Sequence, residues 1–269
     1  MQARQLPAIR GWSWIVEGFQ LFRTNPALLT FLVFGYWLTL VFLNLLPLIG
    51  MVLAPLCVPA LSVGVMNGCR ALERERENVN GNGNGFGLLF SGFQNNGRVL
   101  LVLGAAYLVG SVAVFAASAV VDGGALFGVM MTGQPPPDDL LQNEQMMLAL
   151  QVALILMVPL LMAFWFAPLL AAWEGMPAMK ALFFSFIACA RNWRPFVLYG
   201  LGVAFISAIL PGILLGIVGA VSAPLLRMIA VAISLPLLFV FVPTLFASFY
   251  VSYRDVFART SDVVATVDA

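Results

Sequence analysis

Histidine is absent from this sequence of 269 residues, and only 9% of the residues are charged. Without histidine, the chain lacks the commonest zinc ligand and the usual general base near neutral pH, which excludes zinc hydrolysis and histidine-dependent triads. Soluble domains carry roughly a quarter charged residues. So few charges cannot cover a water-soluble fold, and we therefore expect most of the chain to lie in a membrane.

Cysteine is also scarce, and its spacing fits neither a disulfide framework nor a metal site. Cys57, Cys69 and Cys189 lie far apart in the sequence, and we interpret them as small apolar packing residues. The net charge is only +1 and the arginines are dispersed, which disfavours nucleic-acid binding. We expect no cofactor, no metal and no nucleic-acid partner.

Apolar residues are abundant, at 62% of the chain with a mean hydropathy of +0.99. They form runs of about 20 residues, long enough to cross the roughly 30 Å hydrocarbon layer as helices. The sequence predicts an all-α polytopic membrane helix bundle: one integral membrane domain over 1–269, with six transmembrane helices as three hairpins. The predicted spans lie near 27–47, 49–68, 99–121, 147–171, 196–220 and 229–251.

The first two spans are separated by only four residues, 47–50. This predicts a tight hairpin, with a bent or re-entrant pair as the alternative. The start of the chain lacks the short apolar core and small-residue cleavage site of a signal peptide, so we expect the first span to be an uncleaved anchor.

Lysines and arginines predict the orientation, because positive residues in short loops remain in the cytoplasm. Of the 13 such residues, all except Arg227 fall in the N-terminal segment, the second and fourth connections or the C-terminal tail. The third connection carries acidic residues instead. We predict a multi-pass protein of a bacterial inner (plasma) membrane with cytoplasmic N- and C-termini.

A short pattern recurs before each odd-numbered span: an aromatic segment that ends in asparagine plus a helix-breaking residue. The even-numbered spans share a proline about ten residues before their predicted cytoplasmic end. Together these features predict a parallel threefold repeat. The aromatic segments are Phe19–Pro26, Phe90–Gly97 and Phe184–Pro195, and the prolines are Pro59, Pro168 and Pro243.

Each of these segments has helical periodicity, so we expect a short cytoplasmic-side interfacial amphipathic helix before each hairpin. Such a helix either buries its apolar face among acyl chains or packs on the ends of the protein's own spans, and the sequence favours neither interpretation. The candidate lipid-interface residues are Trp12, Trp14, Phe19, Phe22, Arg23, Phe90, Phe93, Phe183, Phe186, Arg191, Trp193 and Arg194.

Two connections are long and polar. Residues 78–87 alternate asparagine and glycine over much of their length, which predicts a flexible linker. They are not a phosphate loop, because no Gly-Lys-Ser/Thr follows. The connection 122–146 contains Pro135–Pro137, and we expect an irregular extracytoplasmic loop there.

Ionisable residues, which would mark ion paths, are missing from the centres of the spans. Asn44 and Gln151 are candidates for a polar cavity lining or for interhelical hydrogen bonds, and we favour the hydrogen bonds. Small residues recur every four positions in the fifth span, which predicts close helix packing, within the chain in preference to another subunit. These residues are Ala208, Gly212, Gly216 and Ala220.

The segments Gly11–Pro26, Arg70–Glu73 and Ala181–Phe196 resemble an uncharacterised proteobacterial family of six-helix inner-membrane proteins. A looser likeness is to the membrane domain fused to some glycerophosphodiester phosphodiesterases. The catalytic residues of those enzymes lie in a separate domain, so the resemblance supports the architecture and implies no catalytic residue here.

The leading hypothesis is an integral inner-membrane protein of unknown molecular activity that is not an enzyme. It would associate with membrane lipids or with envelope proteins, and other membrane proteins or a second copy are further candidate partners. The alternative is a transporter, channel or lipid-moving protein for a neutral or amphipathic substrate. An enzyme is disfavoured because the spans offer no nucleophile beside a base.

Overall fold

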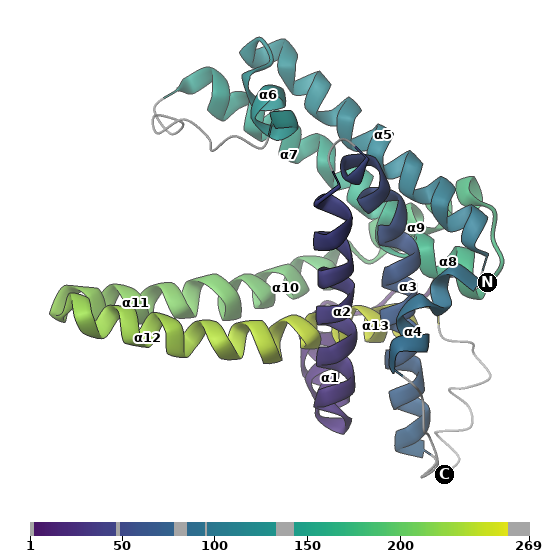
Figure 1. Cartoon of the computed structure of the whole chain (residues 1–269), viewed down its shortest axis with the longest axis horizontal. Helices are drawn as coiled ribbons and strands as arrows, with labels where there is room; N and C mark the ends of the chain where they lie inside the picture. Colours follow the sequence, from purple (N-terminus) through teal and green to yellow (C-terminus); the bar gives the residue numbers. More distant parts are fainter. Residues whose placement is uncertain (1–2, 47–48, 78–84, 95, 133–142, 258–269) are drawn as a thin grey trace. The chain divides into compact units, whose positions relative to one another are not determined.

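The computed structural model describes residues 3–46, 49–77, 85–94, 96–132 and 143–257, and most of these residues are helical (Figure 1). No strand occurs in these ranges. Two short stretches are π-helical and carry the labels η1 and η2. The elements are α1 Arg10–Thr24, α2 Pro26–Asn44, α3 Gly50–Glu77, α4 Gly85–Gln94, α5 Gly97–Asp122, α6 Ala125–Thr132, α7 Glu144–Trp165, α8 Ala167–Trp173, α9 Ala178–Arg191, α10 Trp193–Ala204, η1 Phe205–Ile209, α11 Leu210–Val221, α12 Ala223–Pro236, η2 Leu237–Phe241 and α13 Val242–Phe257.

Within the described ranges, six helical segments are long and apolar enough to cross a membrane, which confirms the predicted all-α polytopic bundle. They are Pro26–Asn44, Gly50–Arg74, Gly97–Asp122, Glu144–Trp173, Trp193–Ala220 and Pro224–Phe257. Each overlaps one predicted span, and most extend several residues beyond it. The helices run past the apolar segments because backbone hydrogen bonding continues into the polar residues at each end.

A helix also precedes each odd-numbered span, as the periodicity predicts: α1 before α2, α4 before α5 and α9 before α10. The connection 122–146 differs from the expected irregular loop, because α6 occupies part of it. Asp122 caps α6 by accepting hydrogen bonds from the backbone amides of Gly124 and Leu126 at 2.9 and 2.7 Å. The first seven residues of the predicted linker, 78–84, lie outside the described ranges, and its last three begin α4.

The chain divides into two compact units, each packed mainly within itself. The first contains Met1–Phe42, Ala60–Asn95 and Ile187–Ala269, and the second contains Leu43–Pro59 and Asn96–Phe186. In the first unit, α1 packs against α13 and α10. In the second unit, α5 packs along α7 and also contacts α6 and α8.

Glycines bring helix backbones together in both units. In the first unit, Gly92 of α4 lies against the carbonyl oxygen of Ala60 in α3, where a side chain would collide. In the second unit, a Cβ atom on Gly104 of α5 would come within 2.6 Å of the Cα atom of Leu56. These contacts fix α4 on α3 and α5 on the first part of α3, since only glycine allows such an approach.

Proline interrupts the fourth span at the junction of α7 and α8, where Pro168 cannot donate a backbone hydrogen bond. Ser185 of α9 is fully buried beside this junction. Its hydroxyl accepts from the amide of Phe166 at 2.9 Å and donates to the carbonyl of Met162 at 2.8 Å. One serine therefore satisfies backbone groups at the break, as apolar surroundings require.

The predicted intramolecular packing of the small residues in the fifth span is wrong for the described residues. A Cβ atom added to Gly212 or Gly216 would meet no atom within 4 Å. Ala208 and Ala220 are exposed as well. This stripe faces away from α12, because α11 contacts its neighbour through a different side that includes Gly219 near Leu226.

Candidate lipid interface and an adjoining polar cluster

Helix α1 has two distinct apolar stripes. The first is buried against α10 and α13 and consists of Gly11, Trp14, Ile15, Gly18, Leu21 and Phe22. The second is formed by Trp12, Val16 and Phe19, which are 42%, 41% and 41% exposed. Their spacing of four and three residues places them on one side of the helix. Each of the two interpretations drawn from the sequence therefore fits one stripe: the first packs on the spans, and the second is available to lipid.

Helix α9 repeats this arrangement. Its small residues Ala181, Ser185 and Ala188 are fully buried, whereas Phe183 is 63% exposed. Met179 and Phe186 are exposed on the same side as Phe183, with the spacing seen in α1. In α9 the buried side is formed mainly by small residues, whereas in α1 it also contains large residues such as Trp14 and Phe22. Both helices expose a stripe of large apolar residues on another side.

Helix α4 is shorter and also has a buried side and an exposed side. Leu89 and Gly92 are buried, Phe93 is exposed and Phe90 is intermediate. The rings of Phe90 and Phe93 stack with centroids 6.4 Å apart, and Phe19 and Phe22 of α1 stack at the same distance. The shared geometry agrees with a repeated pre-span helix.

Two of the candidate lipid-interface residues are buried in the protein, which corrects the sequence interpretation. Trp14 is 0% exposed and meets the rings of Phe196 and Tyr199 edge-on, with centroids 5.3 and 6.0 Å away. Phe22 is 6% exposed. An apolar stripe wider than one face contains both core and surface residues, and periodicity alone does not separate them.

The cationic candidates lie beside the exposed aromatic rings. The guanidinium carbon of Arg23 is 6.0 Å from the centre of the Phe19 ring, and that of Arg194 is 5.5 Å from the Trp193 ring. Arg191 is exposed, and Trp193 is 57% exposed. Cations at this distance are attracted to the ring face, so each pair presents charge and apolar surface together.

Asn44 and Gln151 are both exposed, at the end of α2 and in α7 respectively. Neither is part of a buried lining in the described chain. The asparagines of the recurring pattern have clearer roles: Asn25 accepts from the amide of Leu28 at 3.1 Å and so caps α2, and Asn96 donates to the carbonyl of Ala171 at 3.0 Å. Asn95 lies outside the described residues.

Asn192 is fully buried and holds the segment that precedes α1. Its side-chain oxygen accepts from the amide of Leu6 at 2.9 Å, and its nitrogen donates to the carbonyl of Arg4 at 2.9 Å. The amide of Arg4 in turn donates to the carbonyl of Val256 at 3.0 Å. The entry into α1 is thereby tied to both α10 and α13.

A polar cluster lies on the inner side of α1, where it meets the end of α13. Arg10 forms ion pairs with Asp255 and with Glu17, the latter at 2.9 Å. The indole nitrogen of Trp14 donates to Asp255 at 2.9 Å. Burial lowers the pKa of Arg10, but the hydrogen bond and the charge of Asp255 outweigh it, so the pKa is raised and the guanidinium stays protonated.

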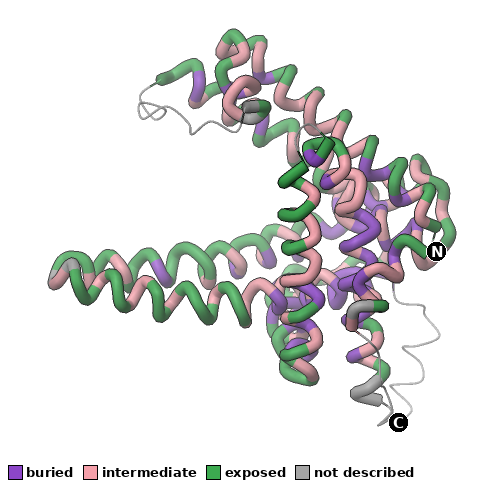
Figure 2. The backbone as a smooth tube through the Cα atoms, viewed as in Figure 1, coloured by how far each residue is buried: buried purple, intermediate pink, exposed green. Residues whose placement is uncertain are grey.

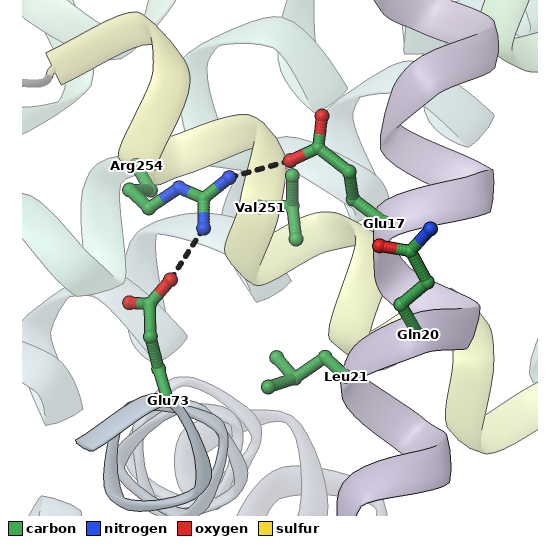
Figure 3. A pocket seen from close by; sticks show the side chains of 6 residues that line it. All are labelled: Glu17, Gln20, Leu21, Glu73, Val251 and Arg254. Atoms are coloured by element: carbon green, nitrogen blue, oxygen red, sulfur yellow. Dashed lines mark hydrogen bonds and ion pairs between the residues drawn. The ribbon is translucent and has the colours of Figure 1, made fainter. Parts of the chain in front are cut away.

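Arg254 extends the cluster to α3 (Figure 3). Its guanidinium lies between Glu17 of α1 and Glu73 of α3 and pairs with both. The hydroxyl of Tyr250 donates to the second oxygen of Glu73 at 2.5 Å. Beside these groups is a hollow of about 160 Å³, which is also lined by Gln20, Leu21 and Val251.

This cluster is suited to holding helices together. Both oxygens of Glu17 and both of Glu73 have a partner, and the two arginines offset two of the three carboxylates. Such a network fixes α1, α3 and α13 at their polar ends. In the ranges that the structure describes, no group of three or more His, Cys, Asp or Glu side chains is arranged to hold a metal ion.

Sequence reasoning used these charges only to predict orientation and missed their pairing. Arg10 and Asp255 are 245 positions apart, and Arg254 and Glu73 are 181 apart. One signal was available: Arg10 and Glu17 lie seven residues apart on α1, on the side opposite Trp12, Val16 and Phe19. A charged side chain at the end of a span normally has a partner of opposite charge. Charged residues at the ends of the other spans were therefore candidates for that partner.

Six apolar spans, three pre-span helices and a charged cluster at one end of the sixth span define a polytopic α-helical membrane protein. The chain is 35% identical over 263 residues to a probable inner membrane protein of Burkholderia thailandensis, covering 96% of this chain and 94% of that protein. It belongs to the same family and is a multi-pass inner-membrane protein. No family model matches the chain, and no solved structure gives a significant match.

Proposed function

We propose that this protein is a non-enzymatic membrane component that binds anionic phospholipid headgroups through the outer faces of α1 and α9, with α4 as a weaker third contact. The observation that carries this proposal is the stripe of exposed large apolar residues that the pre-span helices present beside their buried side. Each helix packs one side against the protein and exposes large apolar residues on another, of which Phe19 and Phe183 are the clearest examples.

The position of these faces supports lipid as the ligand. Helices α1 and α9 end one residue before the spans that follow them, α2 and α10, so their exposed rings lie near the level where a span leaves the hydrocarbon layer. Aromatic rings are favoured at that level because they bury apolar surface while remaining near water. A helix with such a face lies in the membrane plane and inserts it among the upper acyl chains.

The charges beside the rings support an anionic headgroup. Arg23, Arg191 and Arg194 are exposed at the ends of α1 and α9 or at the start of α10. Each arginine near an anionic surface contributes about 1 kcal/mol. If all three arginines contribute fully, the binding constant for an anionic phospholipid would exceed that for a zwitterionic one by roughly two orders of magnitude. The ratio is smaller where water and salt screen the charges.

The test is the lipid preference of the purified protein. The protein is placed in nanodiscs with phosphatidylcholine and a small fraction of spin-labelled phosphatidylglycerol, and the motionally restricted fraction is measured by electron paramagnetic resonance. We expect the R23A/R191A/R194A variant to lose most of the preference for phosphatidylglycerol. The R227A variant is the matched control, because Arg227 is an exposed arginine on α12, away from the pre-span helices.

A double variant, F19E/F186E, tests the apolar contact. Replacing Phe19 and Phe186 by glutamate adds charge to the exposed stripes. We expect weaker binding of both phosphatidylglycerol and phosphatidylcholine, with the helix content measured by circular dichroism unchanged.

An unchanged lipid preference in the triple arginine variant would contradict the assignment of the headgroup contact. Equal loss in R227A would show that net charge alone governs the preference.

A further inference from the structure

The third hairpin contains two π-helical turns, η1 in its first helix and η2 in its second. Each turn lies just before a proline: Pro211 is two residues after η1, and Pro243 is two residues after η2. A proline cannot donate to the carbonyl four residues earlier, which belongs to Ser207 in η1 and to Phe239 in η2. Widened turns and bends are the usual consequence.

One of these carbonyls accepts a hydrogen bond from another helix of the first unit, α2. The hydroxyl of Thr30 in α2 donates to the carbonyl oxygen of Phe239 at 3.5 Å. The rings of Phe34 and Phe239 stack with centroids 4.9 Å apart and an angle of 14°. Helix α2 therefore contacts the third hairpin at the level of η2.

Beyond the two turns, α11 and α12 pack mainly against each other. Most of their apolar side chains are exposed, and Figure 2 shows this part of the hairpin largely in green. Because this outer half has few contacts with the rest of its unit, its direction is set mainly by the two turns.

The third hairpin is also long. Its first helical segment has 28 residues, against 19 in α2, so the two are about 42 Å and about 28 Å long at 1.5 Å per residue. The hydrocarbon layer is roughly 30 Å thick. A segment this long must tilt, bend or extend beyond the layer, whereas α2 fits it upright.

We propose that η1 and η2 form a paired hinge, by which the outer half of the third hairpin changes its tilt to match the length of the surrounding phospholipid acyl chains. In a thin bilayer the outer half bends further from the membrane normal, and in a thick bilayer it straightens. Helix α2 serves as the fixed reference, because it holds η2 through Thr30 and Phe34. The proposal is independent of the headgroup contacts of α1 and α9.

The experiment measures the distance between spin labels on Leu38 of α2 and Ile217 of α11, both exposed. The native cysteines Cys57, Cys69 and Cys189 are replaced by alanine. Double electron–electron resonance is recorded in nanodiscs of phosphatidylcholine with 14-carbon or 22-carbon chains. The lever from the end of η1 to Ile217 is about 12 Å, so a tilt of about 15° moves the label by about 3 Å. We expect the mean distance to differ by that amount between the two lipids.

The P211A/P243A variant tests the hinge itself. Alanine restores both backbone donors and allows regular α-helical turns, so we expect less than half of the distance change. The matched control is P224A, because Pro224 lies in the first turn of α12, outside both hinges, and it should keep the full change. A distance independent of chain length, or a full change in P211A/P243A, overturns the proposal.

Hydrogen exchange of the unmodified protein provides a measurement that needs no cysteine or proline replacement. We expect the amides of residues 205–210 and 237–242 to exchange faster than those of α11 and α12, and the rates to differ between the 14-carbon and 22-carbon lipids. Equal protection along the hairpin in both lipids would contradict a hinge at these turns.

Discussion

Gly18 of α1 lies so close to Ser248 of α13 that a Cβ atom on the glycine would be 2.6 Å from the serine backbone nitrogen. The obstacle is backbone and cannot rotate away, so G18A must separate the two helices. We expect the substitution to lower the free energy of unfolding by about 1–3 kcal/mol, the usual cost of overpacking. Thermal unfolding of the purified protein in one detergent, followed by tryptophan fluorescence, measures the loss.

The control for this prediction is G200A. Gly200 also lies in a helix, but a Cβ atom there would meet nothing within 4 Å. Alanine at an open helical position stabilises by about 0.5–1 kcal/mol. If G18A and G200A had the same effect on the unfolding temperature, the close approach of α1 and α13 would be wrong.

Trp14 and Trp12 should differ sharply in their response to replacement by phenylalanine. Trp14 is buried and donates a hydrogen bond to the Asp255 carboxylate, so W14F leaves that acceptor with one donor fewer. We expect a loss of roughly 1.5–3 kcal/mol, typical of a hydrogen bond to a charged group. Because Trp12 is exposed, W12F should change stability by less than about 0.5 kcal/mol. Equal losses would mean that the two faces of α1 are misassigned.

The six spans could be predicted from the sequence because span formation is local. A run of 20 apolar residues is stable as a helix in hydrocarbon whatever its neighbours are, since its backbone hydrogen bonds are all internal. The pre-span helices could also be predicted, because the periodicity of α1 and α9 is contained within 15 and 14 residues.

Which residues of those helices are buried depends on distant residues and could not be predicted from the sequence. Trp14 is buried because Phe196 and Tyr199 lie beside it, about 180 positions later in the chain. The stripe of Gly212 and Gly216 predicted a helix contact within the chain, but a stripe of small residues permits close approach without specifying a partner. The π-helical turns were also missed: Pro211 and Pro243 predict kinks, but not the type of turn.

The ion pair between Arg254 and Glu73 should be measurable as a coupling energy. The free energies of unfolding of R254Q, E73Q and the double variant form a cycle, and we expect a coupling of about 1 kcal/mol because both side chains are partly exposed. Arg227 lies 27 residues before Arg254 on the sixth span, about 40 Å away. The R227Q and E73Q pair should therefore be additive, and coupling of similar size there would argue against a local ion pair.

The orientation predicted from the arginines can be tested with single cysteines in the protein free of native cysteine. Arg191 and Arg227 are both exposed and lie on opposite predicted sides of the membrane. A membrane-impermeant maleimide added to cells with a permeabilised outer membrane should label R227C at once, because the connection that holds it is predicted to be extracytoplasmic. R191C should be labelled only after the inner membrane is opened. The reverse pattern would place both termini outside, and labelling of both sites in intact inner membranes would show that the predicted span between them, 196–220, does not cross.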